Sequence, residues 1–390
     1  MKKLLLFLLV LIQAHAVEMT DYRTIFGRYD EAYINGSFQA TSGNQDQASY
    51  DLSLEANTRT IYTTAPYSFE FTAEGNTNFS QSEDGNISNT NSYNFYTTTR
   101  YDKYLDYDEL FVYSGTDLGY RKLETSGEAD KAFAKVSFGA GYGRVYNATP
   151  LAVTLRIVEE LKKYKIIKDN LSDIAMLDLA KIIGIKDDYI SKYGDVDYKK
   201  NWFIDIEKIF IDSGLLTEGS LGSFGVIKIE EIIEVEKVAG RFHGWKLRAG
   251  VGQILSSYDG ENESTTVDAE FSYGLPIGYE AQYIEHAIIS KNLDNTKPIN
   301  FQVENSMSYT YEVTDLVDWE NSWDINVDVY HEGDAVIQNR VSTGFRYYLA
   351  NNLTIDTTIG LEKTDGTNGN MQETRDWDGD LFIGVRYRLK

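Results

Sequence analysis

Residues Phe301 to Tyr311 read FQVENSMSYTY, and this stretch decides the fold. Apolar or aromatic side chains stand at odd-numbered positions, and polar ones stand between them: Phe301, Val303, Met307, Tyr309 and Tyr311 alternate with Gln302, Glu304, Ser306, Ser308 and Thr310. Successive side chains of a strand point to opposite faces. This alternation therefore predicts a strand with one face suited to lipid and the other to water.

Segments of the same kind recur along almost the whole chain. Six precede a helix-patterned block, near 32–41, 47–60, 67–75, 92–103, 109–121 and 130–144, and eight follow it, near 243–257, 264–274, 278–290, 299–312, 319–331, 335–348, 353–362 and 377–389. About a dozen residues of alternating hydrophobicity is typical of a strand that crosses a membrane. We predict an all-β transmembrane antiparallel barrel of about 14 strands with an inserted α-helical periplasmic domain.

The amino-terminal sixteen residues have the pattern of a secretory signal peptide. Lys2 and Lys3 precede an apolar run from Leu4 to Ile12, and Ala14-His15-Ala16 supplies a small-residue cleavage site. The apolar run is too short to span a bilayer as a helix. We therefore divide the chain into a signal peptide (1–16), barrel strands 1–6 (17–147), a helical periplasmic insert (148–238) and barrel strands 7–14 (239–390).

Composition narrows the class further. The 390 residues contain no cysteine, 4 Pro and 29 Tyr, with a formal net charge of -23. Without cysteine there can be no disulfide, thiolate metal site or amino-terminal lipid anchor, and tyrosine suits the aromatic girdles at the two bilayer interfaces. The acidic balance excludes nucleic acid as a partner and is best explained by solubility during export.

The lengths of the connections support the strand count. Short links at 63–66, 105–108, 275–278 and 350–352 fall where the count places periplasmic turns, although the links at 42–46 and 332–334 on the opposite side are also short. An even number of strands precedes the insert, and the amino terminus of an exported barrel stays in the periplasm. Parity therefore places the insert on the periplasmic side.

Two segments resemble those of Gram-negative outer-membrane β-barrels of the porin-like superfamily. Tyr347 to Ile355, YYLANNLTI, resembles their tight periplasmic turns, and the last strand, with Leu381, Ile383, Val385 and Leu389, resembles the terminal strand that the barrel-assembly machinery recognises. The chain departs from that pattern by ending on Lys390 instead of Phe. The resemblance implies the cell outer membrane as location, with its lipid, its lipopolysaccharide and the assembly machinery as partners.

Within the insert the apolar period changes to that of helices. Thr149 is a candidate cap with Pro150 in the first turn, Ser172 is a second candidate cap, and a third helix is predicted around Trp202 and Phe210 to end at Gly214. A fourth signal, near Ile229 to Glu234, fits either a helix or a strand entering the barrel. These apolar faces predict a small helical domain with its own core.

Glycines flank the insert on the strands before and after it. We expect six of them to face the lumen: Gly139, Gly141, Gly143, Gly244, Gly250 and Gly252. One hypothesis is that they open space into which part of the insert folds as a plug or constriction. The alternative, which is favoured, is that they permit strand coiling and tyrosine packing.

Charged residues are predicted on the inner face of the strands. Parity assigns to it the acids Glu55, Glu70, Glu74, Asp268, Glu270, Glu304, Asp324 and Asp328 and the bases Lys246, Arg248, Arg340, Arg346, Arg386 and Arg388. The arginines of strands 12 and 14 could face acids across the lumen and create a transverse field that selects hydrated solutes. Equally, these charges could pair with one another. The acidic excess predicts a weak preference for cations.

No motif for chemistry accompanies this pattern. His243, His286 and His331 lie in no recognisable catalytic constellation, so we predict no enzyme, no catalytic residue and no cofactor. The acidic stretch Asp376 to Asp380 lacks the spacing of a calcium loop and is read as a solvated loop, so no metal site is predicted.

Two functions remain. The leading hypothesis is an outer-membrane, porin-like channel for small polar or charged solutes, narrowed or gated by the insert. The alternative is an outer-membrane anchor whose insert, 148–238, binds a periplasmic envelope protein.

Overall fold

The computed structural model describes residues 17–41, 47–82, 84, 90–105, 109–122, 132–234, 236, 238–258, 263–295, 299–331, 335–350, 352–366 and 376–389. The predicted signal peptide lies outside these residues. Fourteen antiparallel strands form a closed barrel in which each strand pairs with its sequence neighbours and β14 pairs with β1. The predicted barrel and its strand count are confirmed.

The strands are longer than the sequence pattern indicated. β1 begins at Gly27 instead of near residue 32, and β3 continues to Gln81 instead of residue 75. Both extensions are rich in polar residues, which hide the alternation. The strands are β1 (Gly27–Thr41), β2 (Ser49–Thr63), β3 (Tyr67–Gln81), β4 (Thr90–Tyr104), β5 (Leu110–Lys122), β6 (Phe133–Asn147), β7 (Phe242–Ser256), β8 (Ser264–Ile277), β9 (Ala281–Asn292), β10 (Ile299–Thr314), β11 (Val317–Tyr330), β12 (Ala335–Ala350), β13 (Leu353–Asp365) and β14 (Asp378–Arg388).

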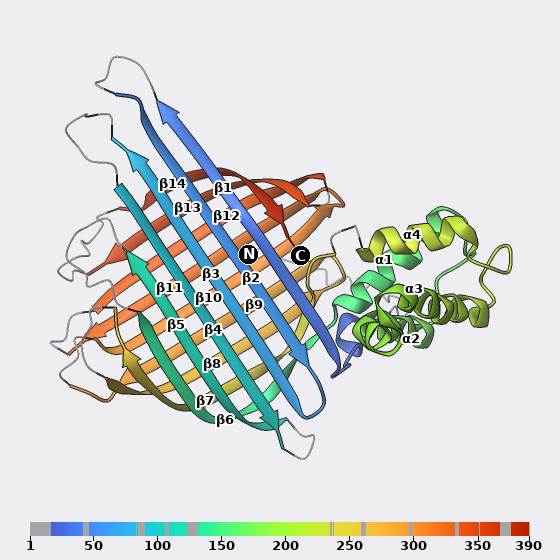
Figure 1. Ribbon diagram of the computed structural model, residues 1–390, viewed down its shortest axis with the longest axis horizontal. Helices are drawn as coiled ribbons and strands as arrows, with labels where there is room; N and C mark the ends of the chain where they lie inside the picture. Colours follow the sequence, from blue (N-terminus) through green and yellow to red (C-terminus); the bar gives the residue numbers. More distant parts are fainter. Residues whose placement is uncertain are drawn as a thin grey trace, which may run out of the picture.

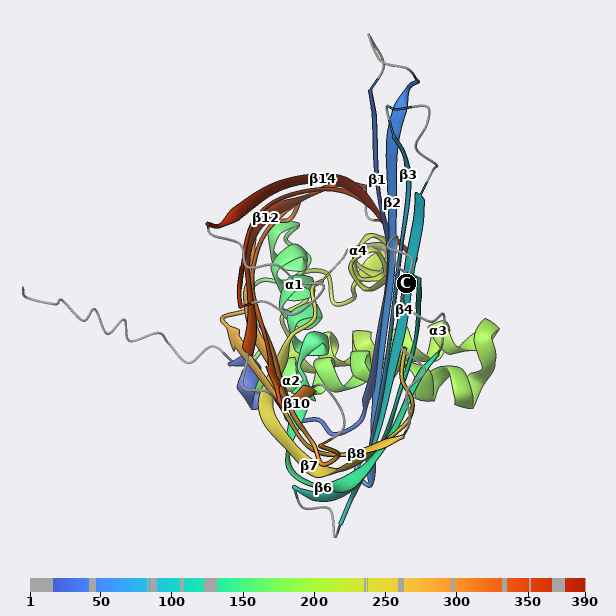
Figure 2. The same cartoon turned by 90° about the vertical axis from the view of Figure 1, so that its left-hand side faces the viewer.

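All the helices of the insert lie at one end of the barrel, where β1 begins and β14 ends (Figure 1). We call this the helix end and the opposite one the loop end. The short turns, such as 64–66, 278–280 and 315–316, are also at the helix end. Viewed along the barrel, β1 to β4 form a nearly flat wall, while β6 to β8 form a tightly curved corner (Figure 2).

Four helices, α1 (Thr149–Lys163), α2 (Asp173–Gly184), α3 (Lys186–Ser213) and α4 (Gly222–Glu234), make up the insert. The Ser172 hydroxyl accepts from the Ala175 amide at 3.3 Å, so the predicted cap of α2 is confirmed. Thr149 was wrong as a cap: Ala148 is the N-cap, and the Thr149 hydroxyl instead accepts from the Arg241 amide at 3.0 Å. The segment near Ile229 is helical and does not enter the barrel as a strand.

Helix α3 contains a break that the sequence analysis missed. Gly194 has φ 75° and ψ 164°, so α3 is two helical pieces, of which only the second was predicted. The second piece buries Tyr198, Trp202, Ile206 and Phe210, and ends at Gly214 with φ 67°, as expected for a left-handed C-cap. None of the described helices is long and apolar enough to cross a membrane.

Residues Val17 to Tyr22, which we call the strap, belong to the insert's hydrophobic core. Val17, Met19 and Tyr22 are buried in one cluster with residues of all four helices. The Tyr22 hydroxyl donates to the Ala180 carbonyl of α2 at 3.2 Å, and the Tyr22 carbonyl lies 2.9 Å from His243 Nε2 on β7. From the sequence these residues were grouped with the barrel strands, because a six-residue segment has too little pattern to reveal its packing.

Candidate functional site

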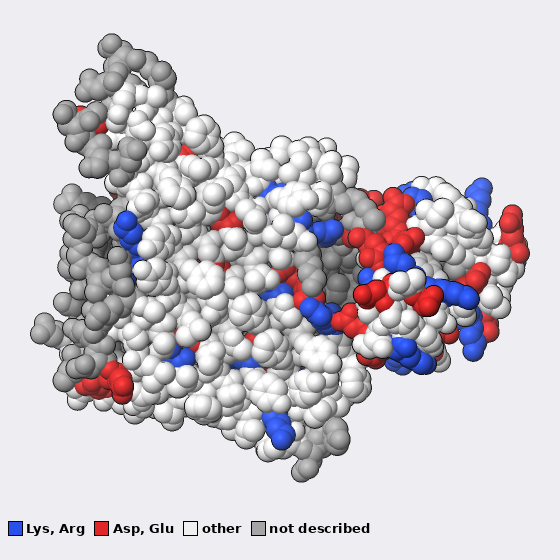
Figure 3. Space-filling model, in the orientation of Figure 1, with Lys and Arg blue, Asp and Glu red and all other residues white. Residues whose placement is uncertain are grey.

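The two faces of the barrel wall differ in chemistry as the alternation predicted. On β5, Leu110, Val112 and Leu118 point outward and are about half exposed, whereas Phe111 and Tyr113 between them are buried inside. Charged side chains are sparse over the visible barrel wall and dense on the helices (Figure 3). The candidate site is therefore the polar lumen and its opening at the helix end.

A buried ion-pair network fills the curved corner of the lumen. Arg248 on β7 donates to Asp102 on β4 at 2.8 Å and also pairs with Glu270 on β8. Arg100 on β4 pairs with Glu270 at 2.9 Å, although three strands separate β4 from β8 in the wall. These charges are stable inside the barrel because they are paired. Burying an isolated charge would raise the free energy of the folded protein by about 5 kcal/mol.

The same network extends to neighbouring strands. Asp102 also accepts from Lys246 at 3.1 Å, and Lys135 on β6 pairs with Asp268 at 2.9 Å. Arg59 on β2 pairs with Glu70 at 2.8 Å. Three predicted pore-lining acids, Glu70, Asp268 and Glu270, are thus bound to cations.

Inner-face glycines explain how the corner closes so tightly. A side chain at Gly139 or Gly250 would collide with the Tyr113 side chain and the facing backbone, and one at Gly141 would collide with the Phe111 ring. One at Gly252 would collide with Asp268 and Lys135. The predicted contact between Gly139, Gly141, Gly250 or Gly252 and the insert is therefore wrong: the neighbours are barrel side chains, in line with the favoured alternative.

Gly143 and Gly244 serve the backbone. Their φ angles are 95° and 100°, in a region that other residues adopt only with strain, and a Cβ on either would collide with a carbonyl oxygen of the facing strand. The atoms that a side chain at either position would meet belong to barrel strands, so the predicted contact of these two glycines with the insert is also wrong. They shape the helix ends of β6 and β7.

Opposite walls meet at the helix end. The rings of Tyr29 on β1 and Phe242 on β7 pack edge to face with centroids 5.0 Å apart, and five strands separate β1 from β7 along the shorter way round. The Arg59 guanidinium lies 5.4 Å from the Phe242 centroid. The lumen is therefore narrowed at this end by side chains of the barrel strands themselves and not by a helix of the insert.

Two arginines complete the constriction. Arg144 on β6 donates to the carbonyls of Thr64 and Ala65 in the β2–β3 turn at 3.0 and 3.1 Å, and it stacks 3.5 Å from the Tyr104 centroid. Arg241, where the insert returns to the barrel, donates to the Tyr279 carbonyl at 2.9 Å and pairs with Glu312 at 2.7 Å. Both tie the root of the insert to turns of other strands.

The arginines of β12 and β14 pair with nearby acids. Arg340 binds Glu362 and Asp380 at 3.0 and 2.9 Å, and Arg346 binds Glu320 and Asp356 at 2.6 and 3.2 Å. Arg386 reaches Asp356 at 2.7 Å. All these acids lie on adjacent or nearly adjacent strands, so these arginines follow the alternative of pairing with neighbouring charges and do not face acids across the lumen. Side chains on neighbouring strands are about 5 Å apart, much closer than the opposite wall.

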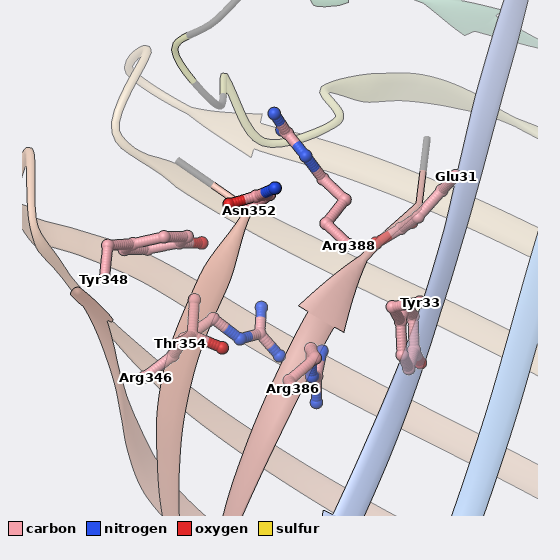
Figure 4. Close-up of a pocket in the computed structure, with 8 residues that line it drawn as sticks. All are labelled: Glu31, Tyr33, Arg346, Tyr348, Asn352, Thr354, Arg386 and Arg388. Carbon is pink, nitrogen blue, oxygen red and sulfur yellow. The ribbon is translucent and has the colours of Figure 1, made fainter. Parts of the chain in front are cut away.

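A small pocket lies beside these arginines near the carboxyl end of β14 (Figure 4). It is lined by Glu31, Tyr33, Arg346, Tyr348, Asn352, Thr354, Arg386 and Arg388. Arg386 lies 4.3 Å from the Tyr33 centroid, which joins β14 to β1. The predicted pore-lining residues Arg346, Arg386 and Arg388 are thus brought together, whereas Arg340 lies nearer the loop end.

Other inner-face acids lack a cation partner among the residues that the structure describes. Glu74 is exposed, and Glu74, Glu304 and Asp328 form no ion pair within the described part of the chain. Glu55 accepts from Asn35 and Asn57 at 3.2 and 2.6 Å, so it too keeps its charge uncompensated by a base. The unbalanced charge of the inner wall is therefore negative.

The insert is held over the helix end by a few polar contacts besides its root and strap. Arg156 on α1 pairs with Asp315 in the β10–β11 turn at 2.5 Å and with Glu236 at 3.6 Å. Arg28 on β1 lies 3.7 Å from Asp187 on α3. Burial raises the pKa of the Glu236 carboxyl, an effect that the Arg156 guanidinium opposes.

The histidines lie apart from one another. His243 contacts the strap, and His286 Nδ1 lies 3.2 Å from the Ser272 hydroxyl. No group of three His, Asp or Glu side chains is placed to hold a metal ion within the described ranges.

Several key residues escaped the sequence analysis. Parity alone places Arg100 and Asp102 on the inner face of β4, so a signal for them existed. The Tyr29–Phe242 contact and the bonds of Arg241 had no such signal, because they depend on the cross-section of the barrel.

No protein-family model and no curated protein sequence matches the chain. Among solved structures, it is similar over 96% of its length to 99% of an outer membrane channel from Pseudomonas putida F1, at 8% identity and TM-score 0.36. It is also similar over 94% of its length to 98% of OmpT of Vibrio cholerae, at 10% identity and TM-score 0.31. A third similarity covers 95% of the chain and 90% of the translocator domain of the autotransporter NalP from Neisseria meningitidis, at 7% identity and TM-score 0.26.

Likenesses of this size carry no inference about function. The class of the protein follows from its own architecture: a closed fourteen-stranded barrel, apolar outside and charged inside, is an outer-membrane β-barrel. The expected location in the outer membrane is confirmed with it.

Proposed function

We propose that this barrel is a porin-like channel for small polar solutes that prefers cations. The observation that carries the proposal is the imbalance of the inner wall: Glu74, Glu304 and Asp328 have no ion pair in the described part of the chain. The bases of the lumen are in contrast largely bound. Those that pair with a carboxylate are Arg59, Arg100, Lys135, Lys246, Arg248, Arg340, Arg346 and Arg386.

Unpaired carboxylates act on a solute more strongly than paired ones, because no neighbouring cation cancels their field. A low-dielectric wall focuses that field into the lumen and concentrates cations there. Since Glu74 lies on β3 and Glu304 on β10, the negative sites line two separate parts of the wall.

We place the helix end in the periplasm. Short turns, the start of the first strand and the end of the last strand are periplasmic in barrels of this kind, and here all of them lie at the helix end. The insert then covers the periplasmic mouth, and the pairs made by Arg156 and Arg28 hold it there. Outer-membrane lipid, lipopolysaccharide and the barrel-assembly machinery are the partners in this proposal, which includes no enzymatic step and no cofactor.

The preference for cations is tested by the reversal potential across a planar bilayer with a KCl gradient. Replacing Glu74→Gln, Glu304→Gln and Asp328→Asn together is expected to lower the ratio of cation to anion permeability. Glu218→Gln, an exposed acid of the insert, is the matched control and should change nothing. Anion preference of the wild-type protein, or no conductance at all, would contradict the proposal.

The role of the insert is tested by deleting it. The Ala148 amide donates to the Arg241 carbonyl at 2.7 Å, so a short turn can join Asn147 to Gly240 without moving the strands. We expect a larger single-channel conductance for the shortened protein. Unchanged conductance would mean that the insert does not narrow the path.

A second function is favoured by the outer surface of the insert. Val196 is 91% exposed and Ile174 is 74% exposed on helices that already have a complete core of their own. Such side chains suit an anchor whose insert binds another periplasmic protein. Recovery of one partner by the wild-type insert, lost in Val196→Asp with Ile174→Asp, together with no conductance, would favour this function over a channel.

A further inference from the structure

The seam between β1 and β14 is only partly paired. β1 pairs with β2 at fifteen positions, from Gly27↔Thr63 to Thr41↔Ser49, and β14 pairs with β13 at ten. β1 and β14 pair with each other at four, from Tyr33↔Arg388 to Gly36↔Val385. Continued in register, the seam would join Ser37 to Gly384 and Phe38 to Ile383, yet neither pair is formed.

The split lies in the loop-end half of the wall. In both views the loop-end halves of β1 and β14 run apart (Figures 1 and 2). Outward-facing side chains stand on both edges of the split: Phe38, Leu381 and Ile383 are 67%, 64% and 61% exposed. Apolar side chains of this kind belong to the lipid-facing belt, so the split opens toward lipid.

Strand edges without partners are costly in hydrocarbon, and irregular backbone is tolerated at membrane depth only where it borders water or protein. The split therefore requires polar groups within reach of its edges. The lumen provides them, because the inner side of the split carries Arg340, Glu362 and Asp380, whose side chains are 41%, 43% and 45% exposed.

These two sides match the two ends of an amphiphile. Outside are Phe38, Leu381 and Ile383, and on the inner face Phe382 lies against Gly384, which has no side chain. Beyond them, one guanidinium and two carboxylates present both signs of charge to a headgroup. A bare anion is disfavoured there, because the guanidinium is already bound to two acids.

Resting on the channel proposed above, we infer that the split is a lateral opening through which a single-chain amphiphile with a zwitterionic headgroup passes between the lumen and the membrane. The hydrocarbon chain of the amphiphile lies between the apolar edges of the split, and its headgroup faces Arg340, Glu362 and Asp380. This extends the solutes of the channel from freely soluble molecules to membrane-soluble ones.

The geometry is tested with cysteine pairs, which are clean because the chain has no cysteine of its own. In liposomes, Gly36→Cys with Val385→Cys is expected to form a disulfide on mild oxidation. Phe38→Cys with Ile383→Cys, two residues further on the same face, is expected to remain reduced. Equal oxidation of the two pairs would overturn the inference, and so would disulfides between two copies through position 38, which would show a protein strand on that edge.

Passage is tested with a fluorescent label on Phe382→Cys, which faces the lumen at the split. Lysophosphatidylcholine with a nitroxide on its chain is expected to quench this label strongly. The control for strong quenching is a label on Val341→Cys, which faces lipid on β12. The control for weak quenching is a label on Ser308→Cys, which faces the lumen on β10. A label at 382 quenched no more than that at 308 would overturn the inference.

The headgroup is tested by replacing the probe with a nitroxide fatty acid. We expect several-fold more of the fatty acid to be needed for equal quenching at 382, and equal potency would overturn the zwitterionic assignment. Ion conductance of the same labelled protein separates the two proposals. Quenching without conductance would contradict the proposed channel and support the lateral opening. Conductance without quenching would contradict the lateral opening alone.

Discussion

The rings of Tyr29 and Phe242 meet inside the barrel with centroids 5.0 Å apart, although they come from opposite walls. The narrowing at the helix end is therefore a property of the barrel itself. The helices lie beyond it, attached through Arg241, Arg156 and the strap.

Phe242→Ala is expected to raise single-channel conductance, because it removes one of the two rings that meet across the lumen. The loss of a buried aromatic ring also costs about 3–5 kcal/mol of stability. The control is Phe345→Ala, a lipid-facing residue that is 53% exposed. Conductance that stays the same in Phe242→Ala and in Tyr29→Ala would show that solutes do not pass this contact.

Asp102→Asn is expected to destabilise the barrel by about 3–5 kcal/mol, since it leaves Arg248 and Lys246 buried with too little negative charge. Urea unfolding in detergent micelles, followed by tryptophan fluorescence, measures the change. Glu362→Gln breaks a pair whose side chains are 41% and 43% exposed, and should cost at most about 1 kcal/mol. Similar losses for both variants would argue against a special role for the corner network.

Tyr22→Ala is expected to destabilise the insert by about 3–5 kcal/mol, because Tyr22 is only 2% exposed. Tyr22→Phe keeps the ring and removes the hydroxyl that donates to Ala180, and should cost about 1 kcal/mol. Thermal unfolding followed by the helical circular dichroism signal provides the measurement. Tyr164→Ala, at a tyrosine that is 44% exposed, serves as the comparison, and a loss as large as that of Tyr22→Ala would contradict the packing described.

Arg156→Gln is expected to loosen the insert and to increase fluctuation between conductance levels. The Arg156–Asp315 pair is partly exposed, so its coupling should be about 0.2–1 kcal/mol and should weaken with salt. Exchanging the charges, Arg156→Asp with Asp315→Arg, should restore steady currents. Lys163→Gln breaks a pair within α1 and should have no effect; fluctuation in that variant would point to a general effect of charge on the insert.

Alternation was sufficient to predict the barrel, because the period of two depends only on each strand and its two environments. It placed Glu74 and Glu304 on the inner face and counted the strands correctly. The fate of an inner charge depends on more than its own strand. Glu270 pairs with Arg248 on the adjacent strand, but its second cation, Arg100, is brought to it by the folded cross-section across three intervening strands.

The glycines show the same limit. The sequence placed Gly139 and Gly141 on the lumen side, but not the residues that would occupy the space they leave. That space is taken by Tyr113 and Phe111 on the adjacent strand. Which residues face each other depends on how the two strands are paired, and the sequence of one strand does not determine it. The strap was missed for a related reason, because its partners lie more than a hundred residues away.

The strap also has a consequence for the order of assembly. The bond from Tyr22 to Ala180 joins residues 158 positions apart, and it closes a loop that contains the first six strands. The entropic cost of a loop rises slowly with its length, by about 0.6 kcal/mol for each doubling. We expect that, once the helical core has formed, the strap holds β1 in place while the later strands are still being added. The last strand, β14, would then pair with the edge of a β1 that is already in place, and the barrel would close in one step.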